Sequence, residues 1–211
     1  MEECISVFDM LKIGVGPSSS HTLGPWRAAE RFLEELRQDF DLNSITRVKV
    51  DLYGSLSLTG KGHATDLAVM LGLSGQDPEY IPVQDIDGII KAIENNHLIQ
   101  LGNEKALPFY ILQDIVFHKE FLPFHANGLT FTAFFENETE YASTFYSIGG
   151  GFVVKEERSN AKKKIAIKCA FPFPINNAAE LLDYTQKENK SISEIVYANE
   201  ISMRPEAEVH S

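Results

Sequence analysis

The chain has 211 residues, of which 44% are hydrophobic and 23% charged, a composition typical of a soluble globular protein with a sizeable core. Its formal net charge of −11 argues against a nucleic-acid partner, which would need a basic face. The sequence has no apolar run long enough for a membrane span and an acidic N-terminus unlike a signal peptide, so we expect a cytoplasmic protein. Two distant cysteines, Cys4 and Cys169, predict neither a disulfide nor a metal site.

The first half of the chain predicts helices around one strand. A short helical turn ends at Gly14, and an amphipathic helix follows over residues 23–38, because its apolar residues recur at i, i+3 and i+4. Alternating apolar residues predict a strand over 46–53. The expected elements after it are a helix capped by Thr65 or Asp66 and ending at Gly72, a loop over 74–84, and a short helix over 86–96.

The second half predicts mostly strands, then helices. Residues 98–129 suggest short strands and turns, and β-branched and aromatic residues predict three longer strands at 129–137, 141–157 and 164–173. Helices are expected over 176–189 and 191–202, followed by a frayed tail. This order predicts an α+β fold with a mixed sheet layered with helices, not a doubly wound one.

The stretch GVGPSSSHTLGP, residues 14–25, is a polar run that leads directly into the first long helix. A helix N-terminus has unpaired N–H groups and a partial positive charge, and serine hydroxyls add further donors. These features predict a site for a carboxylate or phosphate, and the alternative is an elaborate helix cap without a ligand. The candidate ligand-binding residues are Ser18, Ser19, Ser20, His21 and Thr22.

His63 lies in the run GKGHATD, between a glycine-rich loop and the start of a helix. The positive end of the helix dipole disfavours an imidazolium there, so a neutral His63 would be available as a base near pH 7. The alternative is a loop histidine hydrogen-bonded to a backbone carbonyl. The preceding GSLSLTGKG departs from the phosphate-binding loop pattern, because its glycine spacing is one residue too long and Gly62 follows Lys61, which leaves a nucleotide site as a weak alternative.

A third polar segment, LPFHANGL, places His125 and Asn127 beside a turn signal. A zinc site built from His21, His63 and His125 lacks any typical ligand spacing. The run FYSIGGGFVV puts three glycines in a predicted strand, which indicates a bulge or a closely approaching surface. The remaining histidines have no polar neighbours in the sequence and receive no role: His97, His118 and His210.

Four motifs together resemble the N-terminal β domain of bacterial iron–sulfur L-serine dehydratases. They are SVFDMLKIGVGPSSSHTLGP, YGSLSLTGKGHATDLAVMLGLSG, LPFHANGL and FYSIGGGFVV, and the resemblance extends over residues 1–211. It implies a fold similar to the allosteric substrate-binding domain of some D-3-phosphoglycerate dehydrogenases. It also implies conversion of L-serine to pyruvate and ammonia by a homodimer, through a 4Fe–4S cluster held by the cysteines of a separate α catalytic domain that would follow this one.

The resemblance also implies roles for the candidate residues. Residues 18–22 would bind the substrate carboxylate, and His63 would remove the α proton, with His21 as the other candidate base. Thr65, His125 and Asn127 would orient the substrate or cover the cluster. A second hypothesis is a regulatory module that binds serine or another small anion.

Overall fold

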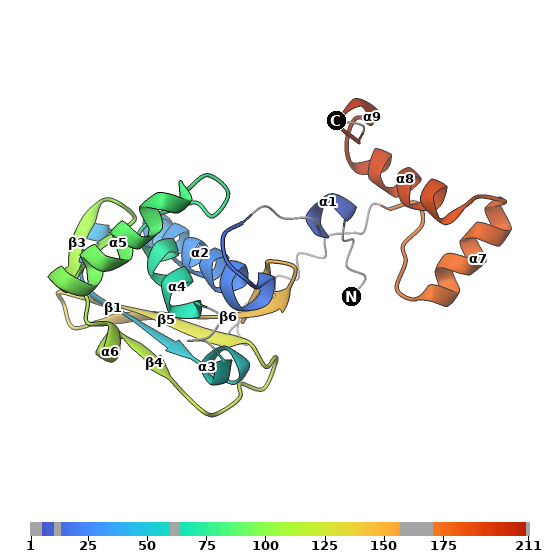
Figure 1. The fold of residues 1–211 in the computed structure, drawn as a ribbon. Coiled ribbons are helices and arrows are strands. Elements are labelled where there is room, and N and C mark those ends of the chain that lie inside the picture. The colour runs from blue at the N-terminus through green and yellow to red at the C-terminus, as the bar shows by residue number, and fades with distance from the viewer. Residues whose placement is uncertain (1–5, 11–13, 60–63, 157–170, 210–211) are drawn as a thin grey trace. The chain divides into compact units, whose positions relative to one another are not determined.

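The computed structural model describes residues 6–10, 14–59, 64–156 and 171–209. The chain divides into two compact units, one of residues Ile13–Arg158 and one of Met1–Lys12 with Ser159–Ser211. The first unit is an α+β domain, which confirms the predicted fold class, and the second is helical (Figure 1). No described helix is long and apolar enough to cross a membrane.

The α+β unit contains a five-stranded mixed sheet in the order β4-β1-β5-β6-β7. Strand β4 runs parallel to β1, and the other neighbouring pairs are antiparallel. The strands of this sheet are β1 (Ile45–Leu52), β4 (Ile115–Phe117), β5 (Gly128–Phe135), β6 (Glu140–Gly149) and β7 (Phe152–Lys155). A separate hairpin pairs β2 (Leu98–Leu101) with β3 (Lys105–Pro108).

Three helices cover one face of the sheet: α2 (Gly24–Asp39), α4 (Thr65–Leu73) and α5 (Val83–Asn96) (Figure 1). Two short helices, α3 (Ser55–Thr59) and α6 (Ile111–Asp114), lie in the connections near β1 and β4. The apolar stripe of α2 is buried against the sheet, with Phe32 stacked on Phe131 at 5.1 Å between ring centroids. Burying each such ring stabilises the fold by roughly 1.5–3 kcal/mol.

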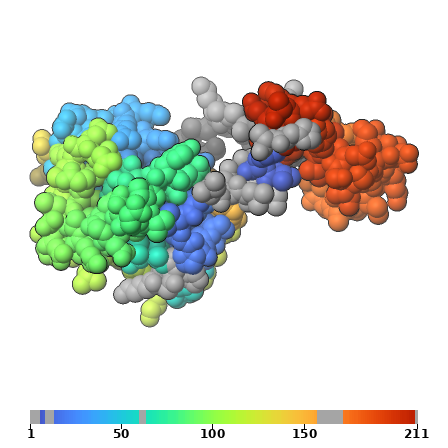
Figure 2. Space-filling model, turned by 45° about the horizontal axis from the view of Figure 1, so that its top comes forward, coloured from blue at the N-terminus to red at the C-terminus, as the bar shows by residue number. Residues whose placement is uncertain are grey.

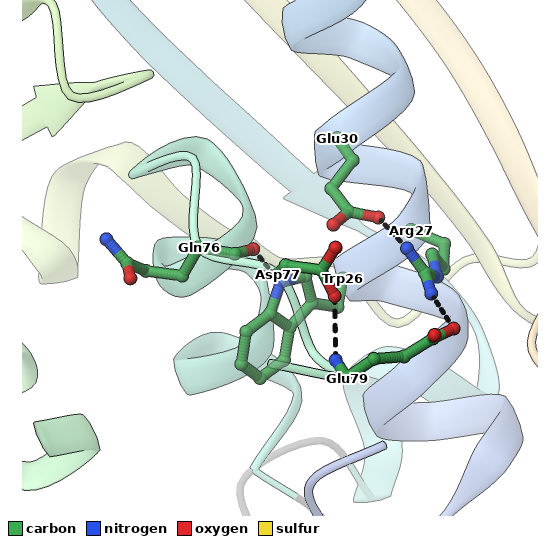
Figure 3. A network of polar contacts seen from close by, with 6 residues as sticks. All are labelled: Trp26, Arg27, Glu30, Gln76, Asp77 and Glu79. Carbon is green, nitrogen blue, oxygen red and sulfur yellow. Dashed lines mark hydrogen bonds and ion pairs between the residues drawn. The ribbon is translucent and has the colours of Figure 1, made fainter. Parts of the chain in front are cut away.

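Trp26, a residue of helix α2, attaches the loop after α4 to this helix (Figure 3). Its indole Nε1 donates to the Gln76 carbonyl oxygen at 2.7 Å. Beside it, the Arg27 guanidinium bridges Glu30 at 2.9 Å and Glu79 at 2.5 Å. Burial raises the pKa of Glu30, and the Arg27 hydrogen bond partly offsets that rise.

The helical unit consists of α1 (Val7–Met10), α7 (Ala178–Glu188), α8 (Ile192–Met203) and α9 (Glu206–Val209). Asn177 caps α7, and Ser191 forms a capping box with Glu194 at the start of α8. Both caps agree with the predicted starts of these helices near residues 176 and 191. The described part of the predicted frayed tail is ordered up to Val209, because α9 follows α8 and Tyr197 donates to Glu206 at 2.7 Å.

Several predicted boundaries are wrong. The segment 141–157 forms two strands, because Gly149, Gly150 and Gly151 all have positive φ and turn the chain between β6 and β7. Helix α5 begins at Val83, directly after Pro82, and so takes residues expected in a loop. Most of the predicted strand 164–173 lies outside the described residues, and residues 171–173 are not in a strand.

Candidate functional site

The opening motif becomes helical at Ser19, which is earlier than residue 23, the predicted start of the first long helix. Residues Ser19–Leu23 form a π-helical turn that continues directly into α2. Ser18 caps this turn, since its Oγ accepts from the His21 amide at 3.2 Å and its carbonyl accepts from the amides of Thr22 and Leu23. The amides of these three residues are therefore engaged within the turn, which corrects the expectation that they are unpaired.

His21 is held at both ring nitrogens by serine hydroxyls. Its Nδ1 lies 2.9 Å from Ser20 Oγ, and its Nε2 lies 2.9 Å from Ser55 Oγ at the start of α3. A hydroxyl can donate or accept, so this pair suits either protonation state of the ring: a neutral imidazole accepts one bond and donates the other, and an imidazolium donates both. The arrangement lets His21 exchange a proton without losing either neighbour.

Thr65 supports the same histidine from helix α4. Its buried Oγ1 donates to the His21 carbonyl oxygen at 2.7 Å. The predicted capping role of Thr65 and Asp66 is wrong, because the N-cap of α4 is Ala64 in the left-handed conformation, without a side-chain cap. The threonine hydroxyl instead fixes the turn that carries the imidazole.

Asn127 and Ser147 connect the third and fourth motifs to this turn. Asn127 Nδ2 donates to the Ser147 carbonyl oxygen at 3.1 Å, and the fully buried Ser147 Oγ donates to the Ser20 carbonyl oxygen at 2.7 Å. Gly24 is required here, because a β-carbon on it would lie 1.9 Å from Ser147 Oγ. His125 lies at the edge of the group, where its Nδ1 accepts from the Asn127 amide at 3.1 Å.

The structure thus brings together residues from all four motifs around His21. Within the opening motif, Ser18 Oγ lies 3.4 Å from Ser20 Oγ, Thr22 is buried, and Ser19 is exposed. Gly16 leaves room for Thr22 rather than for a ligand, since a β-carbon there would lie 2.3 Å from the threonine methyl group. The predicted base, His63, lies outside the described residues.

Sequence reasoning missed Ser55 and Ser147. Both are short polar residues, and Ser147 occupies an inward position in the alternation of β6, where Phe145 and Ser143 are also buried. A serine at a core-facing position of a strand must find a hydrogen-bond partner, and this could have indicated a structural role for Ser147. His118 was also misjudged, because its Nε2 lies 2.6 Å from Asp51 Oδ1 and its ring stacks on Tyr53.

The donor set does not fit an iron–sulfur cluster. Among the residues that the structure describes, no group of three or more His, Cys, Asp or Glu side chains could hold a metal ion. Cys4 and Cys169 both lie outside the described residues. The chemistry that the described site can provide is hydrogen bonding by hydroxyls and amides, and proton transfer by an imidazole.

Comparison with known proteins gives a consistent result. The model of the serine dehydratase beta chain family matches residues 6–158. The chain is 40% identical over 201 residues to an L-serine dehydratase of Haemophilus influenzae, covering 94% of this chain and 44% of that protein. It is 41% identical over 206 residues to L-serine dehydratase 1 of Escherichia coli (97% and 45%), and 41% identical over 207 residues to an L-serine dehydratase of Streptomyces coelicolor (97% and 46%). The chain spans somewhat under half the length of these relatives, and it belongs to the serine dehydratase beta chain family.

Proposed function

We propose that this chain is the β region of an enzyme that converts L-serine to pyruvate and ammonia. The observation that carries the proposal is the meeting of four motifs around His21, in a family whose relatives are named L-serine dehydratases. The enzyme would be a cytoplasmic homodimer, and the likeness of this region to an allosteric substrate-binding domain belongs to the same proposal.

The reaction defines what the site must do. The α proton of serine leaves as a proton, and the β hydroxyl leaves as water. The resulting enamine tautomerises to an imine, and one water molecule hydrolyses that imine to pyruvate and ammonia. The elimination therefore needs donors for the substrate carboxylate, a base for the α proton and an acid for the departing hydroxyl.

In the proposal, His63 is the base and His21 is the second titratable group. Support for His21 comes from its two hydroxyl partners, which accommodate both protonation states. Hydroxyls of the opening motif, Ser18 to Ser20 and Thr22, would bind the carboxylate. Thr65 and Asn127 already donate to backbone carbonyls, which favours a positioning role for them and leaves His125 as the peripheral substrate contact.

The proposal places a 4Fe–4S cluster on an α catalytic domain outside this chain, as the resemblance to iron–sulfur L-serine dehydratases implies. Exposed apolar side chains close in sequence to the candidate site support such a partner. Leu58 follows Ser55, Phe121 and Phe124 precede His125, and Ile148 follows Ser147. An apolar surface beside a polar centre is typical of a protein interface, and the α domain would cover it.

Ser55 offers a test in the full-length enzyme. Ser55→Ala should lower kcat about tenfold or more, because the His21 ring would lose the hydroxyl contact at its Nε2. Ser55→Thr should restore part of the activity, and Ser57→Ala, on the same helix, should leave kcat unchanged. Pyruvate formation measures each result. Wild-type kcat in Ser55→Ala would show that His21 does not act in the reaction.

A further inference from the structure

A cavity of about 260 Å³ lies at the other end of helix α4 from the candidate site. Thr65, which contacts His21, begins α4, whereas Ser74, which lines the cavity, is its C-cap. Thr65 and Ser74 are nine positions apart along the helix, which at about 1.5 Å per residue is a distance of roughly 13 Å. A ligand in this cavity would therefore not compete with the substrate.

The floor of the cavity is aliphatic. Helix α5 contributes Ile89, Ala92 and Ile93, which recur on one helix face, and strand β2 contributes Leu98. Because side chains alternate along β2, Ile99 points into the core while Leu98 faces the cavity. Figure 2 shows the green segment that contains α5 and the β2–β3 hairpin at the surface of this unit.

Four primary amides surround the aliphatic floor: Gln76, Asn96, Gln100 and Asn103. Gln76 Nε2 lies 3.4 Å from Asn103 Oδ1, and in Figure 3 the Gln76 side chain points away from Trp26. Each amide offers both a donor and an acceptor. Among the described residues that line the cavity, none is charged.

Backbone contacts fix the positions of these amides. The Gln76 carbonyl accepts from Trp26 Nε1, and the Gly102 amide donates to the Leu73 carbonyl at 2.8 Å. Gly75, at φ +74°, packs so closely that a β-carbon on it would lie 3.0 Å from Gly102. The cavity is therefore framed by a loop that is already ordered, which lowers the entropic cost of binding.

The electrostatics favour donors over anions. The C-terminal ends of α4 and α5 both border the cavity, at Ser74 and Asn96, and helix C-termini carry partial negative charge. With no cationic side chain among the lining residues, a carboxylate or phosphate would give up part of its hydration without gaining a counter-charge, which costs free energy. Zwitterionic L-serine would face the same cost, so this cavity does not suit the substrate.

We propose that this cavity binds a neutral, planar, amino-substituted nitrogen heterocycle of the adenine type. The flat faces of such a ring pack on the aliphatic floor, and its edge offers the adjacent donors and acceptors that Asn and Gln side chains pair with. Its exocyclic amino group supplies donors to the electronegative helix ends. The inference stands independently of the proposed reaction.

The test is a titration of the chain with adenine, followed by NMR of the side-chain amide groups. Adenine should shift the amide signals of Asn96 and Gln100, with a Kd of about 1 mM or tighter. Gln100→Leu should weaken binding at least about fivefold, because an amide contact is lost. Asn95→Leu, which changes an exposed amide of helix α5 that does not line the cavity, should bind as the wild type does.

Two further ligands test the chemistry of the cavity. Hypoxanthine, in which a carbonyl replaces the amino group, should bind at least about fivefold more weakly than adenine. L-Serine should leave the same signals unmoved. The proposal is overturned if adenine causes no shift, if Asn95→Leu weakens binding as much as Gln100→Leu, if hypoxanthine binds equally well, or if L-serine shifts these signals.

Discussion

The α+β unit and the helical unit are stabilised by different kinds of contact. In the α+β unit, α2 and the sheet bury a continuous set of aromatic and aliphatic side chains, among them Trp26, Phe32 and Phe131. In the helical unit, the buried side chains that the structure describes are Ile195 and three polar ones, Ser6, Asn199 and Glu200. The candidate site lies in the unit with the apolar core, where packing holds its polar groups in place.

Buried polar contacts connect distant parts of the helical unit. Glu200 accepts from Ser6 Oγ at 2.6 Å and from the Val7 amide at 2.7 Å, across more than 190 residues of sequence. Asn199 pairs with the backbone of Phe173 in both directions. Such contacts define geometry but add little net free energy of folding, so this unit should be the more easily opened of the two.

The largest effect concerns the reaction. In the full-length enzyme, His63→Ala should lower kcat and kcat/KM together by roughly 10²–10⁴-fold, because a base is lost from the chemical step. Ser18→Ala should mainly raise KM, and His97→Ala, an exposed histidine stacked on Tyr110, should behave as the wild type. Steady-state kinetics of pyruvate formation decide the matter: normal kcat in His63→Ala with loss in His21→Ala would reassign the base.

Truncating one buried aromatic ring tests the difference between the apolar core of the α+β unit and the exposed side chains of the helical unit. Phe131→Ala should lower the free energy of unfolding of the α+β unit by about 3–5 kcal/mol, the usual cost of such a cavity. Leu182→Ala on α7, whose side chain is 57% exposed, should change it by less than about 0.5 kcal/mol. Urea unfolding followed by fluorescence of Trp26, the only tryptophan, reports on this unit. Equal effects of the two substitutions would contradict the contrast.

A smaller and local effect is expected in the helical unit. Glu200→Ala should leave the Ser6 hydroxyl and the Val7 amide without their acceptor, at a local cost of roughly 1–3 kcal/mol. Hydrogen exchange of the Val7 amide should accelerate, while exchange in β5 stays unchanged. Glu188→Ala, at an exposed position on α7, is the matched control. Unchanged exchange at Val7 would show that Glu200 does not hold α1.

The smallest effect is a pH dependence within the α+β unit. Burial, together with the hydrogen bond that Tyr146 donates to Glu156 at 2.8 Å, raises the pKa of Tyr146 from 10.0 to about 12. Because the folded pKa exceeds the unfolded one, this contribution is present below pH 10 and is lost as the pH rises towards 12. Absorbance titration should show a tyrosine that ionises near pH 12, and this component should be absent in Tyr146→Phe. A Tyr146→Phe titration identical to the wild type would refute this.

Much of the fold was predictable because its periodic patterns are strong. The apolar stripe of α2, the alternation in β1, and the β-branched and aromatic residues of β5 predicted those three elements well. Three glycines in succession were placed inside one strand, although their positive φ angles form the turn between β6 and β7. The local sequence does not distinguish a bulge within one strand from a turn between two strands, because the pairing with neighbouring strands decides which of the two forms.

The sequence predicted which residues belong to the candidate site better than it predicted which of them contact one another. The opening motif, Thr65 and Asn127 do meet, yet Thr65 supports His21 instead of capping its own helix. Ser55 and Ser147 were missed because their roles depend on partners 34 and 127 residues away. Sequence periodicity carries no information about such tertiary hydrogen bonds.

In the proposed function, this chain supplies one half of a shared active site. The direct measurement is pyruvate formation from L-serine by this chain, by the α catalytic domain that the proposal requires, and by their anaerobic mixture. Neither part alone should form pyruvate, this chain should be colourless, and the mixture should be active, less so when this chain carries His21→Ala. Pyruvate formation by this chain alone, or by the α catalytic domain at the same rate with and without this chain, would contradict the proposal.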